Sequence, residues 1–190
     1  MVVGGAATAY SHHLSKNKSA DSQTSTNIPS EWTSYKNDQY GITLSYPKTW
    51  GQPEINSGQG QSKSYSVTFP KYTKRGSSNV TTLFYMDPND LVANKSSIQS
   101  QIRSGVPSAV ASDSSSYATV FSSQSQHISG LSLYQIINLP KIGITGVMAH
   151  LQVVNTKVSC PSNQFSQADT CITRSDYDNL NKITKSIKNL

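Results

Sequence analysis

The chain has 190 residues, a length typical of one domain, and 16 Lys and Arg against 10 Asp and Glu give it a net charge of +6. Only 35% of its residues are hydrophobic and 14% are charged, whereas Ser, Thr, Asn and Gln together make up 75 of the 190. Two cysteines are too few for a disulfide-dense domain, and no apolar run approaches the ~20 residues of a membrane span. The composition fits neither a collagen-like chain nor a coiled coil. The modest net charge argues against generic disorder.

The N-terminal segment divides into two parts. Residues 1–10 are small, apolar and uncharged, and no basic residue precedes Val2. They resemble the end of a membrane anchor or signal peptide, although a start with no targeting role is the alternative. Residues 11–30 carry almost no large apolar side chain and are predicted to be a flexible polar tether. We expect residues 31–190 to form a single domain.

Alternating polarity predicts the first strands of that domain. Residues 40–46 place Tyr and aliphatic side chains on one face and small polar ones on the other, and Pro47 ends the strand. Trp50 is expected to fold back onto the core. Residues 65–69 alternate again, and residues 80–86 are apolar on both faces near their end, which predicts a central strand.

Residues 87–104 are predicted to form a helix. Asp87 fits the N-cap and Pro88 the first turn, while Gly105 and Pro107 stop the helix. Capping is favoured over calcium binding here, because the glycine and terminal glutamate of an EF-hand loop are missing.

The middle of the domain reads as strands and turns. Residues 117–121 are predicted to be a short strand or an ordered loop, and Ser129-Gly130 a hairpin turn before the strand 131–139. Residues 144–157 form the longest strand candidate, with Val147, Ala149, Leu151 and Val153 on one face.

Cys160 and Cys171 enclose a polar, turn-rich stretch, a spacing that suits a disulfide closing a surface loop. The loop-entropy model assigns such a ring roughly 3 kcal/mol of stability. Two free thiols and a reactive cysteine are the alternatives. A disulfide would indicate an oxidising compartment outside the cytosol, and the neutral polar composition agrees with it.

Residues 175–189 are the clearest helix. Ser175 and Asp178 match a capping box, and Lys182, Lys185 and Lys188 are expected to face water. The predicted buried stripe consists of Tyr177, Leu180, Ile183 and Ile187.

A loose basic patch with nearby aromatic residues suggests a binding surface. Charge that merely solubilises the domain is one interpretation, and weak attraction to anionic lipid or cell-wall polymer is another. Nucleic acid is disfavoured, because the charge is not concentrated on one face. The candidate surface comprises Trp32, Trp50, Tyr65, Tyr72, Lys71, Lys74 and Arg75.

Recognisable catalytic constellations are missing from the sequence. It contains no H-E-x-x-H, G-x-S-x-G, C-x-x-C or phosphate-binding glycine loop, and its carboxylates are mostly placed at helix starts or turns. His127 and His150 are weak metal candidates for which a structural role is favoured. The residues indicate no cofactor.

One block resembles a known family. Trp32-x-x-Tyr35, followed by Tyr40-Gly41-Ile-x-Leu44-x-Tyr46-Pro47-x-x-Trp50, is similar to the start of the PsbP-like family of extrinsic photosystem II proteins and their bacterial relatives. The resemblance implies an α+β fold, an α/β/α sandwich in which helices flank an antiparallel sheet, with a C-terminal amphipathic helix and a location outside the cytoplasm. It also implies a non-enzymatic accessory or binding role. The cysteine loop lies outside that family pattern.

Three functions therefore stand as hypotheses. The leading one is a secreted or membrane-tethered, non-catalytic domain that binds another protein or an anionic surface polymer. The second is a small-molecule or metal-binding module that uses Tyr, Trp and His127 or His150. The third is a surface hydrolase with a dispersed site.

Overall fold

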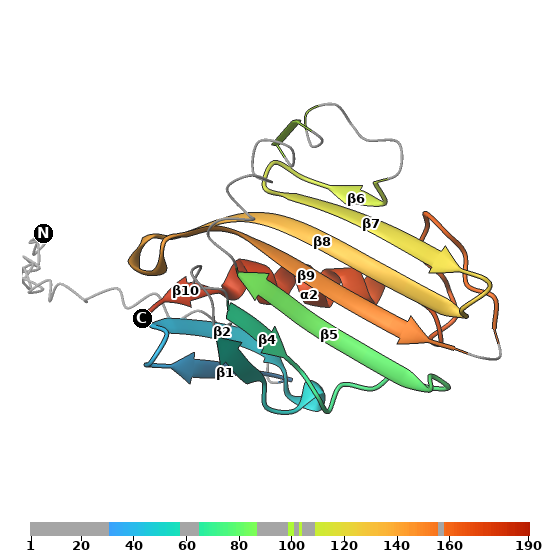
Figure 1. The fold of residues 1–190 in the computed structure, drawn as a ribbon, viewed down its shortest axis with the longest axis horizontal. Coiled ribbons are helices and arrows are strands. Elements are labelled where there is room, and N and C mark those ends of the chain that lie inside the picture. Colours follow the sequence, from blue (N-terminus) through green and yellow to red (C-terminus); the bar gives the residue numbers. More distant parts are fainter. Residues whose placement is uncertain (1–30, 58–64, 87–98, 101–102, 104–108, 156–157) are drawn as a thin grey trace, which may run out of the picture.

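The computed structural model describes residues 31–57, 65–86, 99–100, 103, 109–155 and 158–190. In this part of the chain, ten strands form two antiparallel sheets, and one long helix lies near the C-terminus (Figure 1). The fold is therefore mostly antiparallel β structure with a C-terminal helix, as the sequence predicted in outline. The predicted anchor and tether fall outside the described residues, as does most of the predicted helix 87–104.

The larger sheet has seven strands, and its middle is built from long neighbouring strands. Each neighbouring pair is antiparallel, so hairpins and loops connect the strands at the sheet ends. In spatial order the strands are β3 (Glu54–Ser57), β4 (Tyr65–Thr68), β5 (Asn79–Met86), β9 (Ile144–Val154), β8 (Ile128–Leu139), β7 (Ser116–Ser123) and β6 (Ala111–Ser112).

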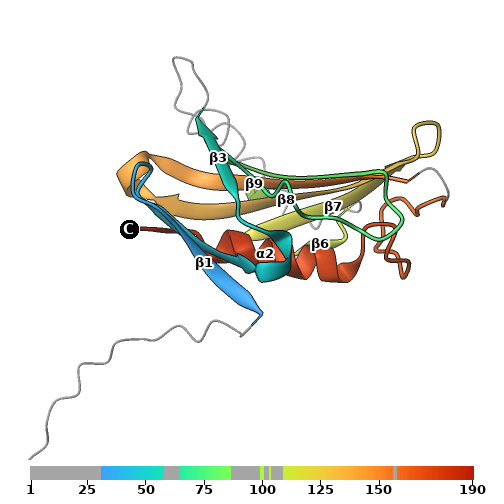
Figure 2. The ribbon, with the colours of Figure 1, turned by 90° about the horizontal axis from the view of Figure 1, so that it is seen from below.

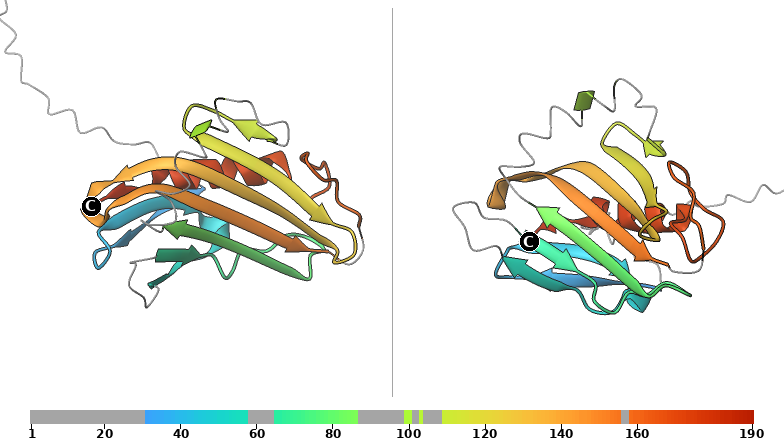
Figure 3. Two further views of the ribbon diagram at one scale, coloured as in Figure 1. Left: turned by 45° about the horizontal axis from the view of Figure 1, so that its top comes forward. Right: turned by 45° about the vertical axis from the view of Figure 1, so that its right-hand side comes forward.

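The smaller sheet and the helix α2 (Arg174–Ser186) form a second layer. This sheet is ordered β1 (Trp32–Asn37), β2 (Ile42–Pro47) and β10 (Lys188–Asn189). The Ser186 hydroxyl accepts a hydrogen bond from the Ser45 amide at 2.8 Å, so the end of α2 meets the edge of β2 just before β10 pairs with it. Figure 2 shows α2 and β1 on one side of the large sheet, and the views in Figure 3 agree.

Two short 3-10 turns, η1 (Lys48–Trp50) and η2 (Pro140–Ile142), follow strands that end at or before a proline. Among the described residues, no helix is both long and apolar enough to cross a membrane.

The core lies between the two layers and follows the predicted alternation. Ile42 and Leu44 of β2 are buried on the same face, as are Val147 to Val153 of β9 at every second position. The helix stripe is buried as predicted: Tyr177, Leu180, Ile183 and Ile187 are each at most 5% exposed. Trp50 is 3% exposed, which confirms that it folds back onto the core.

The predicted strand 80–86 is confirmed as an interior strand, since β5 lies between β4 and β9. It is buried on one face only, because Thr81 and Tyr85 on its other face are exposed. The predicted hairpin turn is wrong. Ser129 and Gly130 lie inside β8 and do not form its turn; the chain reverses just before β8, and His127 has a positive φ of 50° there. The Phe121 ring lies against Gly130, where a Cβ would approach it within 2.0 Å. This close approach explains the glycine.

The start of α2 also differs from the prediction. Thr173 is the N-cap and forms a reciprocal capping box with Asp176, two residues before the predicted pair Ser175 and Asp178. The Asp178 carboxylate instead forms an exposed ion pair with Arg174 at 3.2 Å. The helix consequently begins at Arg174 and ends at Ser186.

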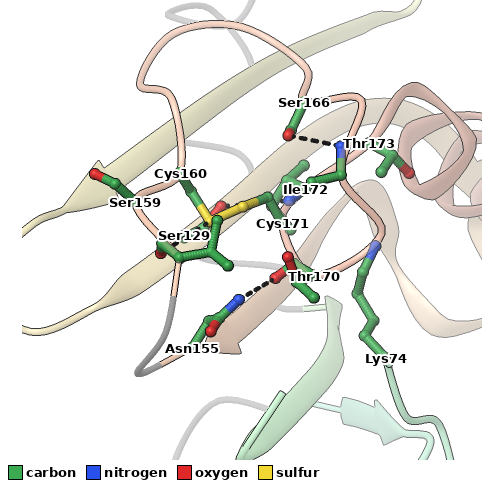
Figure 4. The surroundings of a disulfide bond; sticks show 12 residues. Lys74, Ser129, Asn155, Ser159, Cys160, Ser166, Thr170, Cys171, Ile172 and Thr173 are labelled. Atoms are coloured by element: carbon green, nitrogen blue, oxygen red, sulfur yellow. Dashed lines mark hydrogen bonds between the residues drawn. A yellow bond between two sulfur atoms is a disulfide. The ribbon is translucent and has the colours of Figure 1, made fainter. Parts of the chain in front are cut away.

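Cys160 and Cys171 form a disulfide with a sulfur–sulfur distance of 1.99 Å, as predicted. Both cysteines are buried, and the Asn155 side chain donates a hydrogen bond to the Thr170 carbonyl beside them (Figure 4). The bridge joins the segment after β9 to the segment before α2, and so ties the large sheet to the helix.

Candidate functional site

The aromatic half of the predicted binding surface lies in the core. Trp32, Trp50 and Tyr65 are 8%, 3% and 9% exposed, so they offer almost no area to a ligand. The Trp50 ring stacks on Tyr72 with 4.0 Å between ring centroids and meets Phe69 edge-on. The expectation that these rings form an open surface is wrong, because the contact between the two layers requires large apolar side chains.

The side chains of Lys74 and Tyr72 both contact the buried Asp176 carboxylate. The Lys74 ammonium pairs with the Asp176 carboxylate at 2.5 Å, and both side chains are almost fully buried. The Tyr72 hydroxyl donates a second hydrogen bond to Asp176 at 2.9 Å. Burial raises the pKa of Tyr72, and the charge and hydrogen bond of Asp176 raise it further. Of the predicted surface, Lys71 and Arg75 remain exposed.

The two histidines of the domain are not brought together. His127 is exposed in the turn before β8, while His150 is half-buried in β9. In the sheet, Ile128 lies opposite Val154 and Ser132 lies opposite His150, which puts the histidines more than about 13 Å apart along the strands. The His150 ring stacks on Phe121 and hydrogen bonds Ser132, and burial lowers its pKa.

The described residues contain no group of three His, Cys, Asp or Glu side chains that could hold a metal ion. The two cysteines are joined to each other, so neither is a thiol nucleophile. A metal centre at His127 or His150 would therefore need ligands from outside the described residues.

A groove lies on the outer side of the second layer, and we call it the lysine groove. It has a volume of about 340 Å³ and lies between α2 and the outward face of the small sheet. Every charged side chain that lines it is a lysine. The lining residues are Ser34, Thr43, Ser45, Lys182, Lys185, Ser186 and Lys188.

Strand register explains why these side chains meet. Ser34 of β1 lies opposite Ser45 of β2, and Thr43 of β2 lies opposite Lys188 of β10. Because side chains alternate across a strand, the apolar residues of β2 turn inward while its hydroxyls turn outward into the groove. The last turn of α2 contributes Lys185, close to the strand that follows it.

Two of the groove lysines have weak internal partners. The Lys182 ammonium lies 4.2 Å from the centroid of the Trp32 ring, a cation–π contact. The Lys185 ammonium lies 2.9 Å from the Asp113 carboxylate, and both side chains are well exposed. Partial burial alone would raise the pKa of Asp113, but hydrogen bonds from Lys185, Ser115 and Ser116 lower it well below its ordinary value.

These contacts leave the groove with an excess of positive charge. Asp113 offsets one of its three lysines at most, and an exposed pair of this kind contributes only about 0–1 kcal/mol. An incoming anion can therefore compete for Lys185 at little cost. The arrangement is suited to binding anionic groups, with hydroxyls available for hydrogen bonds.

The groove was not identified as a site from the sequence. The sequence predicts its three lysines on the water-facing side of the last helix and its hydroxyls at outward positions of strands. All three lysines are exposed, but Lys188 lies in β10 and only Lys182 and Lys185 lie on α2. The i, i+3 spacing of Lys182 and Lys185 is a weak signal, since it places both on one helix face. No local pattern indicates that β1 and β2 pack beside that face.

The buried disulfide is the structural feature that bears on location. Such bridges persist in oxidising compartments and are rare in the cytosol. The pairing of Cys160 with Cys171 therefore indicates an extracytoplasmic environment. Comparison of the chain with protein-family models, curated proteins and solved structures found no match.

Proposed function

We propose that the chain is an extracytoplasmic, non-catalytic binding domain that holds an anionic surface polymer in the lysine groove. The observation that carries the proposal is the groove itself, a concave site of about 340 Å³ whose charged lining residues are all lysines. The disulfide supports the location. The net charge of +6 favours anionic partners through long-range attraction.

Two finer features belong to the same proposal. The resemblance of the block from Tyr40 to Trp50 supports a PsbP-like α/β/α sandwich with an accessory role. The apolar start of the chain supports an N-terminal anchor that would keep the domain at a membrane. Either feature would place the groove where surface polymers are found.

A charge-matched comparison tests the groove. Titrating the protein with sodium polyglutamate at low salt is expected to shift the amide resonances of Ser34, Thr43 and Ser45, and the binding should weaken as salt shortens the screening length. The triple variant Lys182→Gln, Lys185→Gln, Lys188→Gln is expected to lose about tenfold in affinity or more, from the loss of three weak ion pairs.

The control removes three charges from other exposed positions, by Lys71→Gln, Arg75→Gln and Arg103→Gln. It should keep most of the affinity if the groove is the site. Equal losses in the two triple variants would show that net charge alone attracts the polymer and would overturn the proposal, as would an absence of binding at low salt.

A further inference from the structure

The neutral side chains that line the lysine groove indicate more about the class of its ligand than the lysines do. Four hydroxyl side chains accompany the three lysines, from Ser34, Thr43, Ser45 and Ser186. A hydroxyl both donates and accepts hydrogen bonds, whereas a carboxylate or phosphate oxygen only accepts them. A site for a bare polyanion would gain nothing from the accepting half of these groups.

The hydroxyls differ in how far they are already satisfied. Thr43 donates to the Tyr35 carbonyl at 2.9 Å, and Ser186 exchanges hydrogen bonds with the Ser45 backbone. Within the described part of the chain, the side-chain hydroxyls of Ser34 and Ser45 have no hydrogen-bond partner. These two lie opposite each other on adjacent strands, so they face a ligand as a pair.

The Trp32 ring beside this hydroxyl pair is closed to a ligand. Trp32 precedes Ser34 by two residues on β1, so both side chains leave the strand on the same side. The ring is 8% exposed, belongs to the hydrophobic core and lies under the ammonium of Lys182. The hydroxyl pair and the lysines are therefore the groups that the groove offers to a ligand.

We infer that the lysine groove binds an acidic polysaccharide. The lysines would pair with the acid groups, and Ser34 and Ser45 would exchange hydrogen bonds with sugar hydroxyls. This inference rests on the proposed function and adds the chemical class of the polymer. An anionic polymer without hydroxyls, such as a polypeptide, could use only the lysines.

Three probes of matched length separate charge from sugar recognition: polygalacturonate oligomers, polyglutamate, and neutral dextran oligomers. Dissociation constants are measured by calorimetry. Polygalacturonate is expected to bind about tenfold more tightly than polyglutamate, as two added hydrogen bonds would allow.

The variant Ser34→Ala, Ser45→Ala isolates the hydroxyl pair. It should weaken polygalacturonate binding about tenfold while leaving polyglutamate binding unchanged. The matched control Thr49→Ala, Ser162→Ala removes two exposed hydroxyls elsewhere and should change neither. Thermal melting checks that all variants are folded.

The possible results separate the polysaccharide inference from the proposed binding of anionic polymers in general. If polyglutamate binds as tightly as polygalacturonate, or the Ser34 and Ser45 variant weakens both equally, the polysaccharide inference is overturned while the anion-binding groove stands. If neither anionic probe binds at low salt, both fail. If dextran binds as well as polygalacturonate, the lysines have no role and the anionic specificity is refuted.

Discussion

The buried ion pair between Lys74 and Asp176 offers the sharpest test of how the fold is held together. It links the loop after β4 to the first turn of α2, and the two side chains are only 7% and 5% exposed. Asp176 also accepts hydrogen bonds from the Tyr72 hydroxyl and from the backbone amide of Thr173. Replacing Asp176 with Asn keeps the shape of the side chain and removes its charge.

The expected loss follows from the burial of the partner that remains. An ammonium left without its counter-ion in such a site costs about 3–5 kcal/mol, because neither water nor another charge replaces the carboxylate. Domains of this kind are stable by about 5–15 kcal/mol, so Asp176→Asn should remove about a fifth or more of the folding free energy. The exposed pair Lys36–Asp38, at 61% and 80% exposure, is the control, and Asp38→Asn should cost at most about 1 kcal/mol.

Urea denaturation followed by tryptophan fluorescence measures these differences, because Trp50 stacks on Tyr72 beside the pair. Lys74→Met alone should also destabilise, since it leaves the carboxylate buried. The double variant Lys74→Met, Asp176→Asn should lose less than the sum of the two single variants, as neither then leaves an unpaired charge. Additive losses, or a loss for Asp176→Asn no larger than that for Asp38→Asn, would refute the reasoning.

Three further predictions concern single features of the fold. Reduction of the disulfide, or Cys160→Ser with Cys171→Ser, should cost about 3 kcal/mol and lower the melting temperature by about 6–12 °C in calorimetry without unfolding the domain; an unchanged melting temperature would contradict the role given to the bridge. Burial lowers the pKa of His150, so below about pH 6.5 the unfolded chain binds a proton at this residue more readily than the folded chain does. The free energy of unfolding should therefore fall as the pH drops below about 6.5. His150→Gln should make that part of the pH profile flatter. Gly130→Ala should destabilise by displacing the Phe121 ring, and adding Phe121→Ala should restore part of the loss in urea melts; an unaffected single variant would show that the ring moves freely.

Side-chain periodicity is what made the strands and the last helix predictable. The alternation in β2 and β9 and the stripe of α2 depend on the geometry of one element at a time, and the structure buries the faces that the pattern indicated. The disulfide was predictable for a similar reason, because its two cysteines are eleven residues apart. Local spacing carries this information without any knowledge of the partner elements.

The start of α2 could not be predicted to the residue from local sequence patterns. Thr173 with Asp176 and Ser175 with Asp178 both fit a capping box, two residues apart. The structure uses the first pair, and Asp176 there also receives Lys74 and Tyr72 from a loop about a hundred residues earlier. Only the first pair places a carboxylate where those groups can reach it, so a tertiary contact selects between two local patterns of equal quality.

The lysine groove could not be predicted from local sequence patterns either, because it also depends on tertiary contacts. Its floor depends on β10, at the end of the chain, pairing with β2 near the start of the domain, which brings Lys188 opposite Thr43. The hydroxyl of Ser186 completes that contact on the Ser45 backbone, across 141 residues of sequence. In the sequence, each lining residue of the groove has the pattern of an ordinary solvent-facing position. The residues form one concave surface because β10 pairs with β2 in the small sheet. A site assembled in this way should be more sensitive to loss of the C-terminal strand than the core is, since the core side chains of β2 and α2 face away from it.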